Sequence, residues 1–243
     1  MATNPKDNVK ALVFDVFGTV VDWRSSTVRE LTSFGNGRGL DADWTRFADD
    51  WRGLYQPAME AVRTGQRAWT ILDDLHRESL ISLLHRHGIR DLAAHEIEHL
   101  NTIWHRLDPW PDSVDGLLRL KRRFIIGTLS NGNIGLLTRM AKRAGLPWDV
   151  ILGAEPARAY KPMPECYLRN AALLNLEPHE VMLVAAHNGD LRAAASTGYR
   201  TAFVVRRQEF GPGQTKDLAA EEAWDVVTDS FIGLAEAMGC SRR

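Results

Sequence analysis

The sequence predicts an α/β fold, built on a doubly wound parallel sheet with a helical segment inserted near its start. Three observations support this prediction. Short apolar runs alternate with helical patterns along much of the chain, an order that produces parallel βαβ units. Polar residues suited to chemistry stand directly after several of these runs. A long stretch after the first run has its apolar residues at helical spacing instead.

The predicted strands are short, nearly continuous apolar runs, as expected for a parallel sheet that is buried on both faces. They cover residues 11–14, 124–129, 181–184 and 201–205, with 149–152 as a weaker candidate. The core helices are predicted between and after these runs, at residues 113–123, 134–144, 164–176 and 191–197. In such a Rossmann-like sheet, chemistry gathers at the carboxyl ends of the strands.

The segment between the first and second runs predicts a helical cap domain. Apolar residues recur at helical spacing over 71–87 and 94–107, and the glycine-rich residues 35–39 predict a loop between its first helices. Prolines at 109 and 111 indicate the return to the core. The predicted division is a Rossmann-like core of residues 1–22 and 108–243, with a helical cap of residues 23–107.

Composition and charge are those of an ordinary soluble protein. The 243 residues include 44% hydrophobic and 25% charged residues, with a formal net charge of -1, so nothing predicts binding to nucleic acid or to an anionic membrane. The two cysteines, Cys166 and Cys240, show no metal or redox spacing and favour a reducing compartment. Residues 1–10 carry no apolar signal core, and no apolar run is long enough to span a membrane. We therefore expect a cytoplasmic protein.

The first two polar clusters follow the first and second core strands. Asp15 ends the first run, and Gly18 permits a tight turn after it whose N–H groups can bind an anion. Ser130 and Asn131 follow the second run at the start of a helix, where the helix N-terminus favours an anion. Taken singly, each of these residues fits an ordinary turn or helix cap equally well or better.

Two further clusters follow later in the chain. Lys161 precedes Pro162, and a lysine beside a carboxylate keeps that carboxylate ionised. His187 and Asn188 follow the run at 181–184, and Asp190 comes just after them, where it could fix Lys161 or position a water. Taken alone, Lys161 would be a solvated surface charge and Asp190 a helix cap.

In this order, the four clusters resemble the motifs of the haloacid dehalogenase superfamily. That superfamily shows a strand-end Asp in a D-x-x-G-T pattern, then a strand-end Ser or Thr, a Lys and an acidic loop, and residues 15–19 match the first of these. The resemblance spans nearly the whole chain. The predicted helical segment also stands where the superfamily has its helical cap.

Phe17 decides between the reactions of this superfamily. Phosphatase members resemble D-x-D, in which the second Asp is an acid/base beside a magnesium ion, whereas this chain has Phe17 there. A phenyl ring can neither donate a proton nor bind a cation. The fourth cluster offers the single carboxylate of Asp190, and Mg²⁺ prefers several oxygen ligands. Both departures favour the 2-haloacid dehalogenase branch, with no metal and no cofactor.

That branch implies hydrolysis of a 2-haloalkanoic acid to a 2-hydroxy acid, with Asp15 attacking the halogenated carbon to form an ester. The resemblance implies that Arg52 and Asn131 stabilise the departing halide. Backbone N–H groups near Thr19, with Ser130, would hold the substrate carboxylate. The implied catalytic residues are Asp15, Thr19, Arg52, Ser130, Asn131, Lys161, Tyr167, His187, Asn188 and Asp190. The implied substrate-binding residues are Val16, Phe17, Tyr55 and Trp69.

The fourth cluster departs from the branch, whose well-known members resemble S-S-N-x-x-D. Here His187 replaces the asparagine, so it could donate a hydrogen bond to halide or water, act as a general base, or be structural. Packing is the other reading of Tyr167 and of the tryptophans in the cap. The halogen, fluoride included, the stereochemistry and the physiological substrate stay open.

The expected partners are a small haloacid and the halide, without nucleic acid or membrane, and a homodimer is suggested by the resemblance alone. Two alternatives stay open. A phosphatase or phosphonatase-like hydrolase of the same superfamily would show magnesium-dependent activity. A catalytically silent binding member would lack the nucleophile or the lysine, and this chain has both Asp15 and Lys161.

Overall fold

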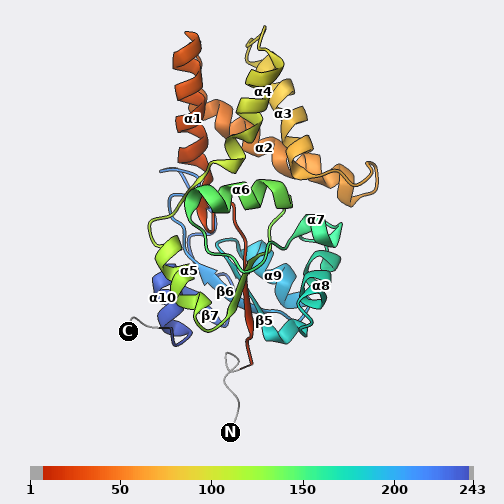
Figure 1. The fold of residues 1–243 in the computed structure, drawn as a ribbon, viewed down its shortest axis with the longest axis vertical. Coiled ribbons are helices and arrows are strands. Elements are labelled where there is room, and N and C mark those ends of the chain that lie inside the picture. The colour runs from red at the N-terminus through yellow and green to blue at the C-terminus, as the bar shows by residue number, and fades with distance from the viewer. Residues whose placement is uncertain (1–7, 241–243) are drawn as a thin grey trace.

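The computed structural model describes residues 8–240 and has the predicted α/β fold, with a parallel sheet at its centre (Figure 1). The strands lie in the order β4-β1-β5-β6-β7. β1 and β5, at the centre, are buried at every residue, as a sheet covered on both faces requires. The strand bounds are β1 (Ala11–Phe14), β4 (Ile125–Thr128), β5 (Val181–Ala185), β6 (Arg200–Val204) and β7 (Val226–Thr228).

Helices cover both faces of the sheet. Side chains alternate between the faces of a strand, so Leu12 and Phe14 of β1 belong to one buried cluster, and Ala11 and Val13 to the other. The helices packed on the first face are α5 (Ser113–Lys121), α6 (Ile134–Ala144) and α10 (Phe231–Ala237). Those on the second face are α7 (Ala154–Ala157), α8 (Pro164–Leu173) and α9 (Asn188–Ser196), with the short 3-10 helix η2 (Pro178–Glu180) before β5.

The four main strand predictions are confirmed, and the weaker one is wrong. Within residues 149–152 only Val150 makes a bridge, an isolated one to Gly127, and the next bridge, from Gly153 to Ser130, is isolated as well. The outermost strand is β7, which the sequence did not indicate. It has three residues, and its central Val227 is 52% exposed, so the apolar run typical of a buried strand is missing.

The helical insert leaves and re-enters the core through a two-stranded antiparallel ribbon. In it, β2 (Val21–Asp22) pairs with β3 (Asp108–Pro109). The helices between them stand beyond the carboxyl ends of the sheet strands (Figure 1). They are α1 (Trp23–Arg38), α2 (Trp44–Arg63), α3 (Leu72–Arg86), α4 (Ala94–Asn101) and the 3-10 helix η1 (Thr102–His105).

We propose that the cap domain comprises residues 23–107, between the two strands of this ribbon, and use the word cap in that sense below. Residues 1–7 and 241–243 of the predicted core lie outside the described residues. Among the residues that are described, no helix has both the length and the apolar character needed to cross a membrane.

The predicted loop at residues 35–39 is wrong. α1 runs through to Arg38, and only Gly39 takes the left-handed conformation that ends a helix, with φ at 62°. Gly35 serves packing instead, since a Cβ at this position would lie 2.4 Å from Cζ2 of Trp44 on α2. The glycine allows the two helices to approach closely, and this use of glycine cannot be distinguished from a turn in the sequence alone.

The cap is fastened to the loops that follow the core strands. The backbone N–H of Asp73, on α3, donates to Asn133 Oδ1 at 3.2 Å, and Asn133 Nδ2 donates to Asp73 Oδ2 at 2.9 Å. Arg63 Nη1, on α2, donates to the carbonyl oxygen of Lys161 at 3.0 Å. Asn133, two residues after Asn131, and Lys161 therefore each form a direct hydrogen bond to the cap.

Candidate active site

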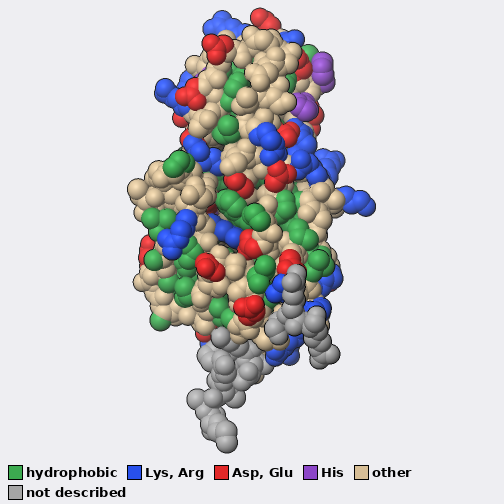
Figure 2. Space-filling view, turned by 90° about the vertical axis from the view of Figure 1, so that its left-hand side faces the viewer, with side chains coloured by type: hydrophobic (Ala, Val, Ile, Leu, Met, Phe, Trp, Pro, Cys, Tyr) green, Lys and Arg blue, Asp and Glu red, His purple; other side chains and the backbone are tan. Residues whose placement is uncertain are grey.

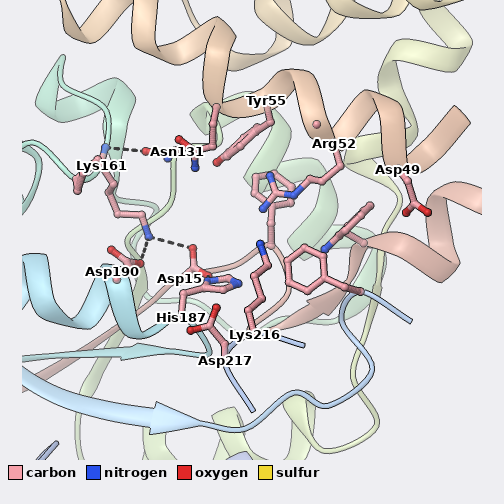
Figure 3. Close-up of a pocket in the computed structure, with 17 residues that line it drawn as sticks. Asp15, Asp49, Arg52, Tyr55, Asn131, Lys161, His187, Asp190, Lys216 and Asp217 are labelled. Atoms are coloured by element: carbon pink, nitrogen blue, oxygen red, sulfur yellow. Dashed lines mark hydrogen bonds and ion pairs between the residues drawn. The ribbon is translucent and has the colours of Figure 1, made fainter. Parts of the chain in front are cut away.

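Asp15 lies at the carboxyl end of β1, between neighbours on both sides in the sheet order, and is only 7% exposed. Three side chains reach its carboxylate, and two of them, Lys161 and His187, are drawn in Figure 3. Lys161 Nζ donates to Oδ1 at 2.9 Å, and Thr19 Oγ1 donates to Oδ2 at 2.7 Å. His187 Nδ1 lies 3.1 Å from the same Oδ2. Members of the first, third and fourth sequence clusters thus meet at one carboxylate.

The surroundings of Asp15 keep it ionised. Burial would raise the pKa of Asp15, but the charges of Lys161 and His187, with hydrogen bonds from His187 and Thr19, hold it far below the usual value. An ionised carboxylate that is almost wholly buried at the floor of a cavity is a ready nucleophile.

Lys161 is shared between two carboxylates. Its ammonium forms ion pairs with Asp15 and Asp190, and both partners are almost fully buried. Burial lowers the pKa of Lys161, while the two carboxylates act more strongly and raise it. Asp190 is held in turn by Tyr167, whose hydroxyl donates to Oδ1 at 2.7 Å. Asp190 and Tyr167 therefore position the lysine, and through it Asp15.

His187 contacts a second acid, which the sequence did not reveal. Its Nε2 lies 2.9 Å from Glu209 Oε2, a carboxylate that is 1% exposed. Glu209 Oε1 also accepts a hydrogen bond from the indole of Trp23 at 3.2 Å. Burial lowers the pKa of His187, but the charge of Glu209 and the contact with Asp15 raise it well above the ordinary histidine value. His187 is thus held between two carboxylates.

Gly18 is required by this arrangement. Its φ is +87°, and a Cβ there would lie 2.1 Å from Glu209 Oε1, which Trp23 and His187 hold in place. We expect Gly18→Ala to lower the free energy of unfolding by about 2–4 kcal/mol, measured by urea denaturation, because both the clash and the left-handed backbone are costly.

The matched control is Gly37→Ala, on an exposed part of α1 where a Cβ would meet nothing within 4 Å. Alanine is the better helix former, so this variant should be neutral or stabilised by about 1 kcal/mol at most. Equal stability of the two variants would show that Glu209 can move away from Gly18.

A cavity of about 730 Å³ opens above Asp15, between the core and the cap. Basic and acidic side chains gather where cap and core meet on the face shown in Figure 2. Arg52 of α2 forms part of the cavity wall, with its guanidinium carbon 4.1 Å from the centroid of the Tyr55 ring and 5.4 Å from that of Trp23. Its Nη1 is buried with no hydrogen-bond partner among the described residues. Arg52 therefore offers an unused cationic donor close to the nucleophile (Figure 3).

Most of the predicted site residues lie at this cavity or one contact away from it. Thr19 and Tyr167 do not line it but act through Asp15 and Asp190. Asn131 Oδ1 accepts the backbone N–H of Lys161 at 2.8 Å, which leaves its amide nitrogen for the cavity and Tyr55. The predicted residues in the cavity wall are Asp15, Phe17, Arg52, Tyr55, Asn131, Lys161, His187 and Asp190.

The structure does not bring three predicted residues to the cavity wall in the expected way. Trp69 stacks on Tyr160 with ring centroids 4.8 Å apart and is not part of the lining. Val16 is wholly buried in the core. Ser130 is wholly buried as well, and its Oγ accepts the backbone N–H of Gly132 at 3.1 Å. Val16 and Trp69 therefore serve packing, and Ser130 supports its loop.

Asn188 is also turned away from the nucleophile. Its Nδ2 donates to Asp217 Oδ1 and to the carbonyl of Ala219, each at 3.0 Å. Its Oδ1 accepts from the indole of Trp224 at 2.9 Å and from the backbone N–H of Glu221 at 3.0 Å. All of these partners lie in the chain between β6 and β7. Asn188 fastens that loop, and it has no donor or acceptor left to position a water.

Sequence reasoning missed the part of the site that this loop supplies. Glu209, Phe210, Lys216 and Asp217 all lie between β6 and β7, and the last three line the cavity. The segment looks like a polar surface loop in the sequence, and none of these residues follows a strand directly. The only feature of this segment that could have indicated a site is an acidic residue with polar neighbours, and that pattern is common in any exposed loop.

The comparisons with known proteins agree with this geometry. Residues 9–198 match the model of the haloacid dehalogenase-like hydrolase family. A solved structure described as a defluorinating L-2-haloacid dehalogenase is 49% identical, with a TM-score of 0.94 and 95% of each chain covered. Another, described as an L-2-haloacid dehalogenase, is 44% identical with a TM-score of 0.93, and covers 96% of this chain and 100% of that one.

Sequence comparison adds a curated relative. The (S)-2-haloacid dehalogenase 1 of Pseudomonas sp. (strain CBS-3) is 30% identical over 219 residues, which are 82% of this chain and 86% of the relative. A family match over most of the chain and a relative of this coverage lead to one conclusion. The chain belongs to the haloacid dehalogenase-like hydrolase family, in the branch of the (S)-2-haloacid dehalogenases.

Proposed function

We propose that this protein hydrolyses short 2-haloalkanoic acids to 2-hydroxy acids, through an ester between the substrate and Asp15. One observation carries the proposal: an ionised carboxylate, Asp15, shares the wall of one cavity with Arg52, whose Nη1 has no hydrogen-bond partner among the described residues. Displacement of a halide needs this pair, a nucleophile and an acceptor for the charge that leaves. The relatives described as 2-haloacid dehalogenases support the same reaction.

In the first step, an oxygen of Asp15 bonds to the carbon that carries the halogen. The carbon–halogen bond breaks, and the halide leaves with the bonding electrons toward Arg52 and the amide nitrogen of Asn131. The negative charge of Asp15 moves to the halide, which leaves Lys161 and Asp190 as a balanced ion pair. Charge is thus stabilised on both sides of the cavity throughout the displacement.

The proposed reaction needs no metal ion and no cofactor. A halide is a weak base and departs without a proton, so a hydrophobic residue is acceptable at Phe17, where a phosphatase of this superfamily would carry an acid. Phe17 instead packs against the cap, with its ring centroid 6.4 Å from that of Tyr55 and 5.8 Å from that of Trp104. Its ring excludes water from the site of displacement.

In the second step, we propose His187 as the base that activates water. Once Asp15 is an ester, its negative charge no longer raises the pKa of His187. With Nε2 facing Glu209, Nδ1 of a neutral imidazole faces the ester and can take a proton from water. The water oxygen bonds to the ester carbonyl carbon, and the bond between that carbon and the ester oxygen breaks. The imidazolium gives the proton to this leaving oxygen, which completes the hydroxy acid. The regenerated carboxyl group of Asp15 then loses its own proton and is again ionised.

The location and the oligomeric state are proposed on grounds other than the geometry of the site. We propose a cytoplasmic location, on the strength of two cysteines that are free and buried. A homodimer is proposed on the family resemblance. We include fluoride among the halides to be tested, because a solved relative is described as defluorinating.

The proposal is tested by halide release from chloroacetate, fluoroacetate and each enantiomer of 2-chloropropionate, with excess EDTA present throughout. We expect release of halide that chelation does not change, together with equimolar 2-hydroxy acid. Absence of release from every substrate, with magnesium-dependent cleavage of a phosphate ester instead, would place the chain with the phosphatases of the family.

A further inference from the structure

The two donors that would receive the halide come from different parts of the molecule. Arg52 belongs to α2 of the cap, whereas Asn131 belongs to the turn of residues 130–133 that follows β4 in the core, called the β4 turn below. Both line the cavity (Figure 3). A halide in contact with both is stabilised only while cap and turn keep a fixed separation, because a donor displaced by about 1 Å loses much of its effect.

The side chain of Asn133 joins this turn to the cap and gives up its ordinary role to do so. An asparagine directly before a helix usually accepts an N–H of that helix. Asn133 stands before α6 without such a bond, and the N–H of Ile134 donates instead to Glu155 Oε2 at 2.6 Å. Both polar atoms of the Asn133 amide are bonded to Asp73. Asn133 is only 5% exposed, so water competes little for these bonds.

Asp73 is joined in turn to the part of the cap that carries Arg52. One turn of α3 beyond Asp73, the carbonyl oxygen of His76 accepts the indole N–H of Trp51 at 3.2 Å. Trp51 is wholly buried and directly precedes Arg52 on α2. The second carboxylate oxygen of Asp73 lies 3.0 Å from His105 Nε2. A path of hydrogen bonds thus runs from the β4 turn through α3 to the neighbour of Arg52.

The donor on the core side is fixed within its own turn. Asn131 Oδ1 accepts the backbone N–H of Lys161, and Ser130 Oγ accepts that of Gly132. The β4 turn is therefore held as a unit, and the bonds of Asn133 set its position relative to the cap helices.

We propose that the pair of Asp73 and Asn133 positions Arg52 and Asn131 around the departing halide. The inference rests on the proposed function and deepens it. Asp73 is a positioning residue, because neither it nor Asn133 lines the cavity. Chloride is a more basic leaving group than bromide and needs more stabilisation as it departs. Loss of the pair should therefore slow displacement of chloride more than displacement of bromide.

Single-turnover release of halide tests this difference. Asp73→Ala should slow release from chloroacetate about tenfold and release from bromoacetate by less than about threefold. Asp73→Asn keeps an oxygen for Asn133 Nδ2 and should stay within about twofold for both substrates. Adding Asp73→Ala to Asn133→Ala should slow release no further than Asn133→Ala does, because the second substitution has no bond left to remove.

The matched control is Asp74→Ala. Asp73 and Asp74 are the two acids in the first turn of α3, and Asp74 is exposed, so this variant removes the same charge from the same helix end. It should change neither rate. The inference is overturned if Asp73→Ala slows both substrates equally or not at all, or if Asp74→Ala has the same effect. Should Asp73→Ala fail to fold, Asn133→Ala breaks the pair from the core side and is judged by the same comparison of substrates.

Binding of chloride gives a reading that needs no chemistry. Asp15→Asn provides the background, because it leaves no ionised nucleophile to repel an anion. Broadening of the ³⁵Cl NMR signal should show that adding Asp73→Ala weakens chloride binding about tenfold. Equal broadening with and without Asp73→Ala would overturn the inference. If chloride binding falls as expected but the unaltered protein releases halide from no haloacid, the proposed function is refuted while the positioning of the anion site by Asp73 stands.

Discussion

Asp15→Asn is expected to lower halide release from chloroacetate by about four orders of magnitude or more, because the amide has no ionised oxygen to attack carbon. The substitution keeps the shape of the side chain, and Lys161 keeps its ion pair with Asp190. The fold should therefore survive, which thermal unfolding would verify. Release within about tenfold of the unaltered protein would mean that Asp15 is not the nucleophile.

Labelled water separates covalent catalysis from direct attack by water. In a single turnover in H₂¹⁸O with enzyme in excess, the hydroxy acid should carry an unlabelled oxygen that came from Asp15. The label should then appear in the Asp15 carboxylate, found by mass spectrometry of the peptide that contains it. Label in the product of the first turnover would contradict the ester mechanism while leaving dehalogenation itself intact.

His187→Ala is expected to slow hydrolysis of the ester about 10²–10³-fold, the usual contribution of a general base. Displacement of halide does not use this base, so the ester should accumulate. Intact-protein mass spectrometry after mixing with 2-chloropropionate should show nearly every chain carrying one acyl group, along with a burst of one halide per site. If displacement and ester hydrolysis slow equally and no burst appears, His187 only orients Asp15 and is not the base.

Glu209→Gln is the matched variant for the same step. It keeps the hydrogen-bonding shape beside Trp23 and His187 but removes the charge that raises the pKa of His187. We expect partial accumulation of the ester, with a smaller fall in rate than for His187→Ala. If this variant hydrolyses the ester as fast as the unaltered protein, Glu209 plays no part in ester hydrolysis.

The pH dependence has a definite sign. The pKa of His187 is raised in the folded protein, so the bound proton stabilises the fold fully below the ordinary histidine pKa. This contribution is lost as the pH rises through the folded value. The rate of ester hydrolysis should change in the opposite sense and increase as His187 loses its proton. Both dependences should disappear in His187→Ala, measured by urea denaturation and by single-turnover kinetics.

The sequence was informative where a functional residue lies within three residues of the end of a strand. Asp15, Asn131 and His187 occupy such positions, and parallel strands bring their carboxyl ends to one edge, so the meeting of these residues could be predicted. Lys161 and Asp190 were found by their place in the motif order. However, a position near a strand end did not predict the direction in which the side chain points. Asn188 stands next to His187, yet its side chain holds the loop on the other side.

The site residues that the sequence did not indicate are brought to the site only by the tertiary structure. Trp23 and Glu209 are 186 positions apart and belong to segments with no shared pattern. Lys216 extends from a turn whose shape depends on Asp217 and Gln214. Trp69 shows the opposite case: an aromatic residue in a cap can face a cavity or a neighbouring ring, and the ring of Trp69 stacks on Tyr160.

The hydrogen bonds between cap and core limit how this protein could be recombined with its relatives. Residues 23–107 are connected to the core through one short ribbon, so the cap could be exchanged as a single segment. The hydrogen bonds between cap and core argue against such an exchange. Asp73 is tied to Asn133, and Trp23 shares Glu209 with His187. A working chimera would have to inherit the β6–β7 loop and the turn at Asn133 together with the donor's cap, because most of the residues that line the cavity lie outside the cap.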